Sequence, residues 1–212
     1  MKKSKEYYFA KAISWIFHPM LAPTIGIYII NTYFGDRLHL TEDGELYLII
    51  ITAISTILLP SAFIPMMLHQ KIITSIEIKT SKERLSPLFL FAIFYFFAWY
   101  VLFRLQAPLV YKTFMFTAGT SVLIGLGINF LTKVSMHMIG IGGLTGSVYS
   151  LMLYSNANLQ LVIVILILIA GFTAYSRLKL NAHSPLQVYL GYVVGVFVAI
   201  CLFYFFKDSL YL

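Results

Sequence analysis

Long apolar stretches separated by short polar segments set the pattern of this chain from end to end. Seven of them approach the roughly 20 mostly apolar residues that a membrane-crossing helix needs. They cover residues 9–33, 46–69, 87–105, 108–131, 134–154, 159–175 and 185–206. The pattern therefore predicts an all-α bundle of about six to seven transmembrane helices, seven by this division. No linker-like or low-complexity tract divides the chain, so residues 1–212 are expected to form a single transmembrane domain.

Proline positions indicate that the first two apolar stretches are interrupted. His18-Pro19 and Pro23 lie near the start of the first stretch, and Pro60 and Pro65 lie within the second. Proline has no N–H for the helical ladder, and its ring crowds the preceding turn. We therefore expect a kink or break near the start of the first span. In the second span, neighbouring groups in the bundle must satisfy the freed carbonyls.

Composition supports the membrane interpretation and narrows the partners. Hydrophobic residues make up 60% of the chain and charged residues only 11%, against about 25% charged in a soluble domain. The basic segment 1–11 runs into the first apolar stretch without a small-residue cleavage site, which favours a retained span over a removed signal peptide. The net charge of +7 is spread over short segments between apolar runs. This distribution favours anionic lipid head groups over nucleic acid as the partner.

Cationic residues are unevenly divided between the two ends of the predicted spans. Eleven would lie on the N-terminal side: Lys2, Lys3, Lys5, Lys11, Lys71, Lys79, Lys82, Arg84, Lys133, Arg177 and Lys179. Four would lie on the far side: Arg37, Arg104, Lys112 and Lys207. By the positive-inside rule, the N-terminus is expected on the cytoplasmic side of an inner or plasma membrane.

Three polar segments hold most of the reactive side chains, at residues 77–87, 133–140 and 176–187. Two predicted spans separate each segment from the next, so all three return to the N-terminal side. Arginine binds phosphate with two parallel hydrogen bonds, and lysine adds a point charge. A neutral imidazole can attack phosphorus, and a second imidazole can protonate the leaving oxygen. The convergence therefore suits hydrolysis of a lipid phosphoester without a metal or other cofactor.

The start of the last span has a regular spacing. His183, Gln187, Gly191 and Gly195 are four residues apart, which would place them on one helix face. A Gly-x-x-x-Gly pair lets a neighbouring helix approach closely. His183 is therefore expected to project from the start of a tightly packed helix, which is a fixed position for a nucleophile.

These residues resemble the motifs of the type 2 phosphatidic acid phosphatases, which are integral membrane lipid phosphatases. Ser176-Arg177, five residues, His183, three residues and Gln187 is similar to the third family motif, in which the last position is aspartate. Ser135 and His137 match the second motif, Pro-Ser-Gly-His. Arg84 is the best match to the arginine of the first motif, with Lys79 or Lys82 before it and Pro87 displaced by two positions. The phosphatase-like core would cover residues 77–206.

The resemblance implies a role for each matching residue. His183 would be the nucleophile and His137 the general acid. Phosphate would be bound by Arg177, Arg84, Lys79, Lys82 and Ser135. Gln187 stands where the family has the aspartate that orients the nucleophilic imidazole, so it would supply a hydrogen bond without a charge. Either Glu77 or Glu83 would then replace the carboxylate from another segment, or the protein would be a slow enzyme or no enzyme. The substrate would be a phosphatidate-like phospholipid or a polyprenyl phosphate.

Other interpretations of the same residues remain open. His137 could bond across helices, His183 could be a structural residue at a helix start, and the lysines could be interfacial anchors. A pseudophosphatase that binds phospholipid head groups without turnover would account for Gln187. A small lipid or anion transporter would account for the interrupted spans. The five histidines show no close ligand spacing, so no metal site is expected.

Overall fold

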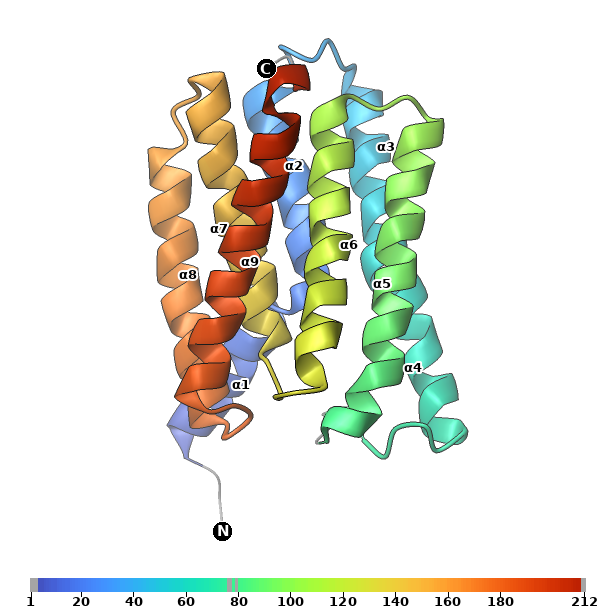
Figure 1. Cartoon of the computed structure of the whole chain (residues 1–212), viewed down its shortest axis with the longest axis vertical. Helices are drawn as coiled ribbons and strands as arrows, with labels where there is room; N and C mark the ends of the chain where they lie inside the picture. The colour runs from blue at the N-terminus through green and yellow to red at the C-terminus, as the bar shows by residue number, and fades with distance from the viewer. Residues whose placement is uncertain (1–3, 76–77, 79, 211–212) are drawn as a thin grey trace.

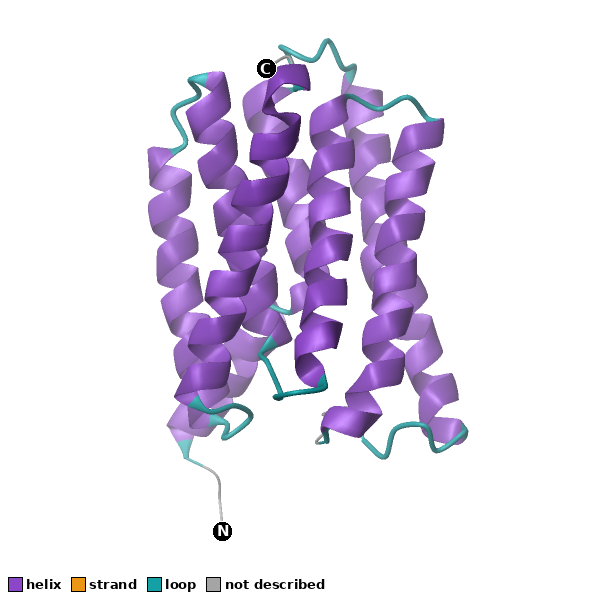
Figure 2. Cartoon of the chain, in the orientation of Figure 1, coloured by secondary structure: helices purple, strands orange, loops and turns teal. Residues whose placement is uncertain are grey.

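The computed structural model describes residues 4–75, 78 and 80–210. Every regular element within them is a helix, in the order α1 (Lys5–Ile16), η1 (Pro19–Leu21), α2 (Ala22–Phe34), α3 (Glu42–Ala53), η2 (Ile54–Leu58), α4 (Leu59–His69), α5 (Ser81–Arg104), α6 (Leu109–Asn129), α7 (Met136–Ser155), α8 (Gln160–Lys179), α9 (Pro185–Phe206) and η3 (Lys207–Ser209). The helices form one bundle of near-parallel axes, with loops at its two ends (Figures 1 and 2).

Seven helical segments of the described chain are long and apolar enough to cross a membrane. The seven-span prediction is therefore confirmed, and the chain is an integral membrane protein. The two termini lie at opposite ends of the bundle, as an odd number of spans requires (Figure 1). The third span begins at Ser81, earlier than its apolar stretch, because Thr80 caps α5 by accepting a hydrogen bond from the Glu83 N–H at 3.3 Å.

The first two spans are interrupted, as their prolines predict. In the first span α1 ends at Ile16, and the short 3₁₀ helix η1 joins it to α2. In the second span a π-helical segment, η2, lies just before Pro60. The two interruptions meet: the Thr56 hydroxyl of η2 is 3.3 Å from the Met20 carbonyl of η1 and 2.9 Å from the Thr52 carbonyl. The hydroxyl has a single hydrogen, so it donates to one of these two carbonyls at a time and links the two breaks inside the bundle.

Glycines allow α7 and α9 to pack backbone against backbone. A Cβ on Gly142 would lie 2.4 Å from the Tyr192 carbonyl oxygen, and one on Gly195 would lie 2.3 Å from the Ile139 carbonyl oxygen. Gly146 and Gly191 meet backbone atoms of the partner helix at 2.7 Å in the same way. The close approach predicted from the Gly-x-x-x-Gly pair is therefore present, and α7 is the partner. It fixes the start of α9 beside the start of α7.

The first helix lies along the end of α8. The Ser176 hydroxyl donates to the Ala10 carbonyl at 2.6 Å, and Lys179 forms an ion pair with Glu6. These contacts tie the first span to the sixth at the end of the bundle where the N-terminus lies (Figure 1). The same end receives the starts of α5, α7 and α9.

Candidate functional site

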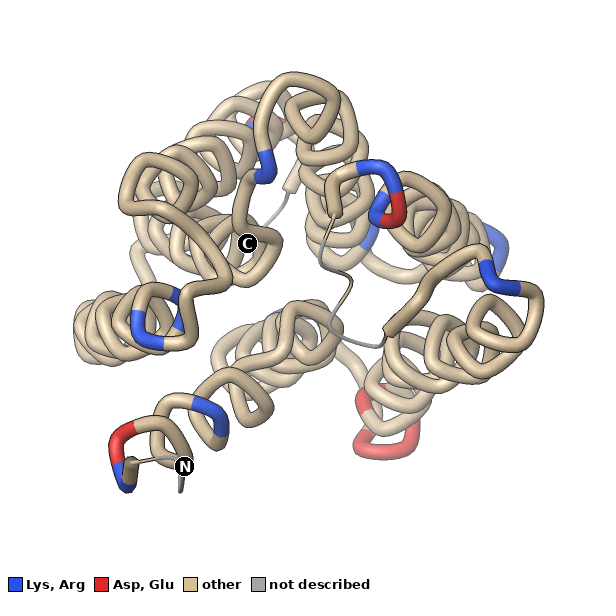
Figure 3. Tube along the Cα trace, turned by 90° about the horizontal axis from the view of Figure 1, so that it is seen from below, with Lys and Arg blue, Asp and Glu red and all other residues tan. Residues whose placement is uncertain are grey.

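A cavity of about 560 Å³ lies at this end of the bundle. Its walls come from α1, η1, α5, α7, α8 and the loops before α7 and α9. Its ionisable lining includes Lys11, His18, Arg84, Lys133, His137, Arg177 and His183. No Asp or Glu occurs among the described residues that line it. Figure 3 views this end of the molecule and shows the lysines and arginines on separate segments of the chain. With four cations and no carboxylate among the described lining residues, the cavity favours an anion.

His183 lies in the loop before α9 and is only 8% exposed. Its Nδ1 is 3.0 Å from the carbonyl oxygen of Lys133. A carbonyl can only accept a hydrogen bond, so Nδ1 carries the hydrogen. In the neutral ring the lone pair is therefore on Nε2, the nitrogen that a nucleophilic imidazole needs free.

Gln187 does not orient His183, contrary to the role that the resemblance implies. Its Oε1 accepts from the Ser184 N–H at 3.1 Å, and its Nε2 is 3.2 Å from the Thr132 hydroxyl. With the Ser184 hydroxyl it forms a capping box at the start of α9. His183 does not share a helix face with Gln187, although the two are four residues apart. Ser184, in an extended conformation, is the N-cap of α9, so His183 lies before the helix begins. The Lys133 carbonyl makes the hydrogen bond expected from Gln187.

His137 faces the same cavity from the first turn of α7. Its Nε2 lies 3.1 Å from the Ser14 carbonyl oxygen and 3.3 Å from the Ser14 hydroxyl. Nε2 therefore carries a hydrogen that the Ser14 carbonyl accepts. The same Ser14 hydroxyl accepts from Nη1 of Arg177 at 2.5 Å. Ser14 thus links the predicted acid to one of the predicted phosphate-binding arginines.

Arg84 is held by backbone carbonyls on two sides. Its Nε donates to the Ile78 carbonyl at 3.4 Å and its Nη1 to the Val134 carbonyl at 3.2 Å. These bonds leave Nη2 for a ligand in the cavity. Near Arg84, the Asn129 amide donates to the Ser81 carbonyl at 2.8 Å and ties the start of α5 to the end of α6. The guanidinium is therefore fixed before any ligand binds.

Two predicted phosphate-binding residues do not reach the cavity, and a third is not described. Lys82 is exposed at the start of α5 and does not line the cavity. Ser135 is fully buried, and its carbonyl faces Gly191 across the contact between α7 and α9. Lys79 lies outside the described residues. The structure thus brings together His183, His137, Arg177 and Arg84 from the predicted set.

The first span supplies lining residues that the sequence analysis missed. Tyr7, Lys11, Ser14 and His18 all line the cavity. Their spacing of four, three and four residues is the signature of one helix face, so the signal was present in the sequence. Lys133 was also missed as a site residue. Lys133 belongs to the polar segment 133–140, but a pattern of residue types does not show which backbone carbonyls accept hydrogen bonds.

His18 holds the break in the first span and faces His137. Its Nδ1 accepts from the Met20 N–H at 3.4 Å, which caps η1. Its ring centroid is 5.3 Å from that of His137, with the two planes at 77°. The interruption of the first span thus places a third imidazole in the cavity.

Burial and neighbouring cations keep His183 uncharged. Burial, followed by the charges of Arg84 and Arg177, lowers the pKa of His183 to about 3. Burial and the same two arginines also lower the pKa of Lys133. Both shifts disfavour a further positive charge in the cavity, so an anionic ligand would relieve the repulsion.

The lowered pKa predicts how labelling of His183 depends on pH. Diethylpyrocarbonate attacks neutral imidazole, and a free histidine with a pKa of about 6.5 loses about 30-fold in neutral fraction between pH 7.5 and 5. His183 should stay neutral over that range because it titrates below it. Its labelling rate, measured by peptide mass spectrometry and normalised to the reagent, should therefore change less than twofold. A fall parallel to that of N-acetylhistidine in the same tube would contradict this assignment.

Fold and cavity together define an integral membrane protein with a cationic, histidine-lined site at one end of its bundle. Comparison with known proteins adds no relative: no family model, no curated protein and no solved structure matches this chain.

Proposed function

We propose that this protein is an integral membrane phosphatase that hydrolyses a lipid phosphomonoester or diphosphate through a phosphohistidine intermediate at His183, without a metal. The observation that carries the proposal is the hydrogen bond from Nδ1 of His183 to the Lys133 carbonyl at 3.0 Å. It leaves Nε2 as the nucleophile, in a cavity lined by cations and by no described carboxylate.

The reaction would proceed in two steps. In the first, the Nε2 lone pair of His183 forms a bond to phosphorus as the bond from phosphorus to the lipid oxygen breaks. In the second, a water molecule attacks the phosphohistidine, and the bond from nitrogen to phosphorus breaks. Inorganic phosphate leaves and His183 returns to its neutral form. The Lys133 carbonyl holds the Nδ1 hydrogen throughout and faces the positive charge that develops on the ring.

His137 is the proposed source of the proton for the leaving lipid oxygen. Since its Nε2–H is bonded to the Ser14 carbonyl, the transferable proton must sit on Nδ1. That requires the doubly protonated ring, which the negative charge of a bound phosphate favours. In the second step the same Nδ1 would take the proton from the attacking water.

Arg84 and Arg177 are the proposed phosphate-binding residues, with Lys133 and Lys11 as further cations in the lining. The two arginines are anchored by other bonds, Arg84 by two carbonyls and Arg177 by the Ser14 hydroxyl. Fixed donors stabilise a developing charge more effectively than donors that must first reorganise. The excess of cations at this end supports a site on the cytoplasmic side, where a lipid head group would reach it from the interface.

The proposal is tested by phosphate release in detergent with excess chelator. The substrates are phosphatidate, phosphatidylglycerophosphate and a polyprenyl diphosphate. At least one should be hydrolysed by a chelator-insensitive reaction. Quenching with ³²P-labelled substrate should trap a protein-bound label that is labile in acid and stable in alkali, as expected of a phosphorus–nitrogen bond. Release without such a label in rapid-quench experiments would argue for direct attack by water instead.

Binding without turnover is the second candidate function, and one observation favours it. Among the described residues, the group behind His183 is the neutral Lys133 carbonyl and not a carboxylate. Glu83 accepts a hydrogen bond from the Thr74 hydroxyl instead, and Glu77 lies outside the described residues. An aspartate behind His183 would stabilise the charged imidazole more strongly. Saturable binding of phosphatidate with no release from any of the three substrates would support a head-group binding protein.

A further inference from the structure

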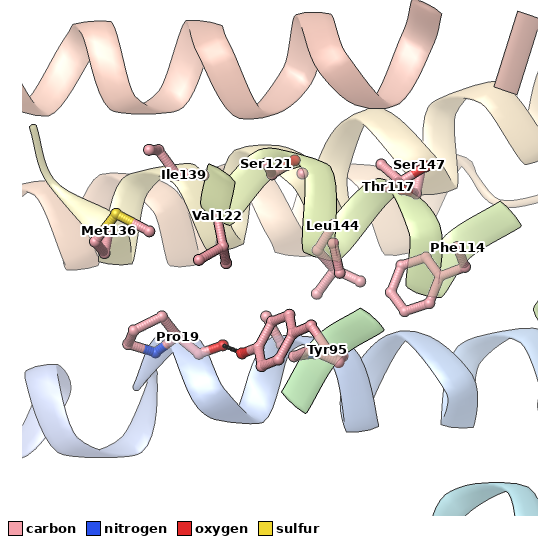
Figure 4. Close-up of a pocket in the computed structure, with 15 residues that line it drawn as sticks. Pro19, Tyr95, Phe114, Thr117, Ser121, Val122, Met136, Ile139, Leu144 and Ser147 are labelled. Carbon is pink, nitrogen blue, oxygen red and sulfur yellow. Dashed lines mark hydrogen bonds between the residues drawn. The ribbon is translucent and has the colours of Figure 1, made fainter. Parts of the chain in front are cut away.

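A second, apolar pocket continues from the cationic cavity into the bundle. It lies among η1, α2, α5, α6 and α7, as Figure 4 shows. Four residues line both spaces: Pro19, Tyr95, Val122 and Met136. The Tyr95 hydroxyl donates to the Pro19 carbonyl at 3.4 Å, so a hydrogen bond marks the junction. The pocket therefore opens where the polar cavity ends.

The pocket is narrow and runs along α7 towards the middle of the membrane. Its volume is about 50 Å³. Met136, Gly140, Gly143 and Ser147 line it with spacings of four, three and four residues. At 1.5 Å per residue this stripe is about 16 Å long. The pocket thus extends from the cationic end to about half the depth of the hydrocarbon core. A narrow slot of this volume has room for the first few methylene groups of one hydrocarbon chain.

Two hydroxyls in the pocket lack hydrogen-bond partners. Ser121 and Ser147 are 4% and 1% exposed, and neither Oγ has a partner within the described part of the protein. Both residues line the pocket and are labelled in Figure 4. Buried hydroxyls are normally hydrogen-bonded, so a ligand that brings an oxygen to this depth would satisfy them. A pure hydrocarbon chain would leave both unsatisfied.

We propose that this pocket binds one acyl chain of the lipid phosphate, with the ester carbonyl near the head group accepting a hydrogen bond from the Ser121 hydroxyl. The inference rests on the proposed function and names its substrate class, an acyl-ester lipid phosphate. The phosphate occupies the cationic cavity, and the chain passes Tyr95 and Val122 into the slot. An acyl lipid has an ester carbonyl that can accept from a hydroxyl, followed by a hydrocarbon chain that can occupy the apolar slot. A polyprenyl chain has no oxygen beyond its phosphate.

Gly143 gives a test of the chain site. A Cβ at Gly143 meets only the Ser121 hydroxyl at 3.9 Å and the Gly195 carbonyl oxygen at 4.0 Å, and Gly143 lines the pocket, so a larger side chain there takes up part of its space. Gly143→Leu should lower the ratio of kcat/KM for dioleoyl phosphatidate to that for glycerol 3-phosphate by about 10-fold or more. Gly171→Leu is the matched control, because Gly171 on α8 has open space around it and lies outside the pocket. An unchanged ratio in Gly143→Leu, or an equal fall in Gly171→Leu, would overturn the chain site.

Ser121→Ala distinguishes an acyl-ester substrate from a polyprenyl substrate. It should weaken phosphatidate turnover about 5-fold or more relative to turnover of a polyprenyl phosphate, since only the former offers an ester acceptor. Equal effects on the two substrates would overturn the acyl assignment. Binding of a non-hydrolysable phosphonate analogue of phosphatidate provides a readout that does not need turnover. If wild type binds it and Gly143→Leu does not, the chain site stands even when the phosphatase proposal fails.

Discussion

Replacing His183 by glutamine is expected to reduce lipid phosphate hydrolysis by on the order of 10⁴-fold or more, because the nucleophile is lost while the cations remain. Glutamine can still donate an amide hydrogen to the Lys133 carbonyl, so the loop before α9 should keep its position. The variant should therefore bind the phosphonate analogue with unchanged affinity. The measurement is phosphate release and phosphoenzyme trapping in the same preparation, with His69→Gln as the matched control because His69 is exposed and outside the cavity.

Two substrates with different leaving groups distinguish the role of His183 from that of His137. If His137 protonates the lipid oxygen, His137→Gln should slow hydrolysis of phosphatidate far more than that of p-nitrophenyl phosphate, whose leaving oxygen needs no proton. His183→Gln should abolish both. Full activity of His183→Gln on either substrate would exclude the phosphohistidine mechanism.

Replacing Gly195 by valine is expected to have the largest effect on stability. Its Cβ would lie 2.3 Å from the Ile139 carbonyl oxygen and 2.6 Å from the Gly143 nitrogen. Both are backbone atoms, so no side-chain rotation relieves the clash, and α7 and α9 must separate. Overpacking of this kind costs roughly 1–3 kcal/mol or more. The thermal midpoint in detergent should fall by about 2–4 °C for each kcal/mol lost.

Separation of α7 and α9 should also disturb the candidate functional site. His183 precedes α9 and its hydrogen-bond acceptor, Lys133, precedes α7, so the contact between the two helices sets the distance of that bond. Gly195→Val should therefore lose phosphatase activity even in the fraction that stays folded. Gly127→Val and Gly171→Val are the controls, since a Cβ at either position meets nothing within 4 Å. An unchanged midpoint in Gly195→Val would contradict the observed packing.

The seven spans, their order and the break near Pro19 could all be predicted from the sequence. These follow from apolar length and from the missing proline N–H, which are local properties of the chain. The even number of spans between the polar segments also placed Arg84, His137, Arg177 and His183 at one end of the bundle.

Which side chains meet in the site could not be predicted from the sequence, because it depends on how the helices pack. Gln187 is four residues after His183, but the extended N-cap between them breaks the helical geometry that would have joined them. Ser135 matches a motif position and still turns into the contact with α9, because the glycines there let the helices close over it. Lys11, Ser14 and His18 line the site because α1 packs on α8 and η1 packs on α7. Helix rotation and backbone carbonyls set these contacts, and neither is encoded in a one-dimensional pattern of residue types.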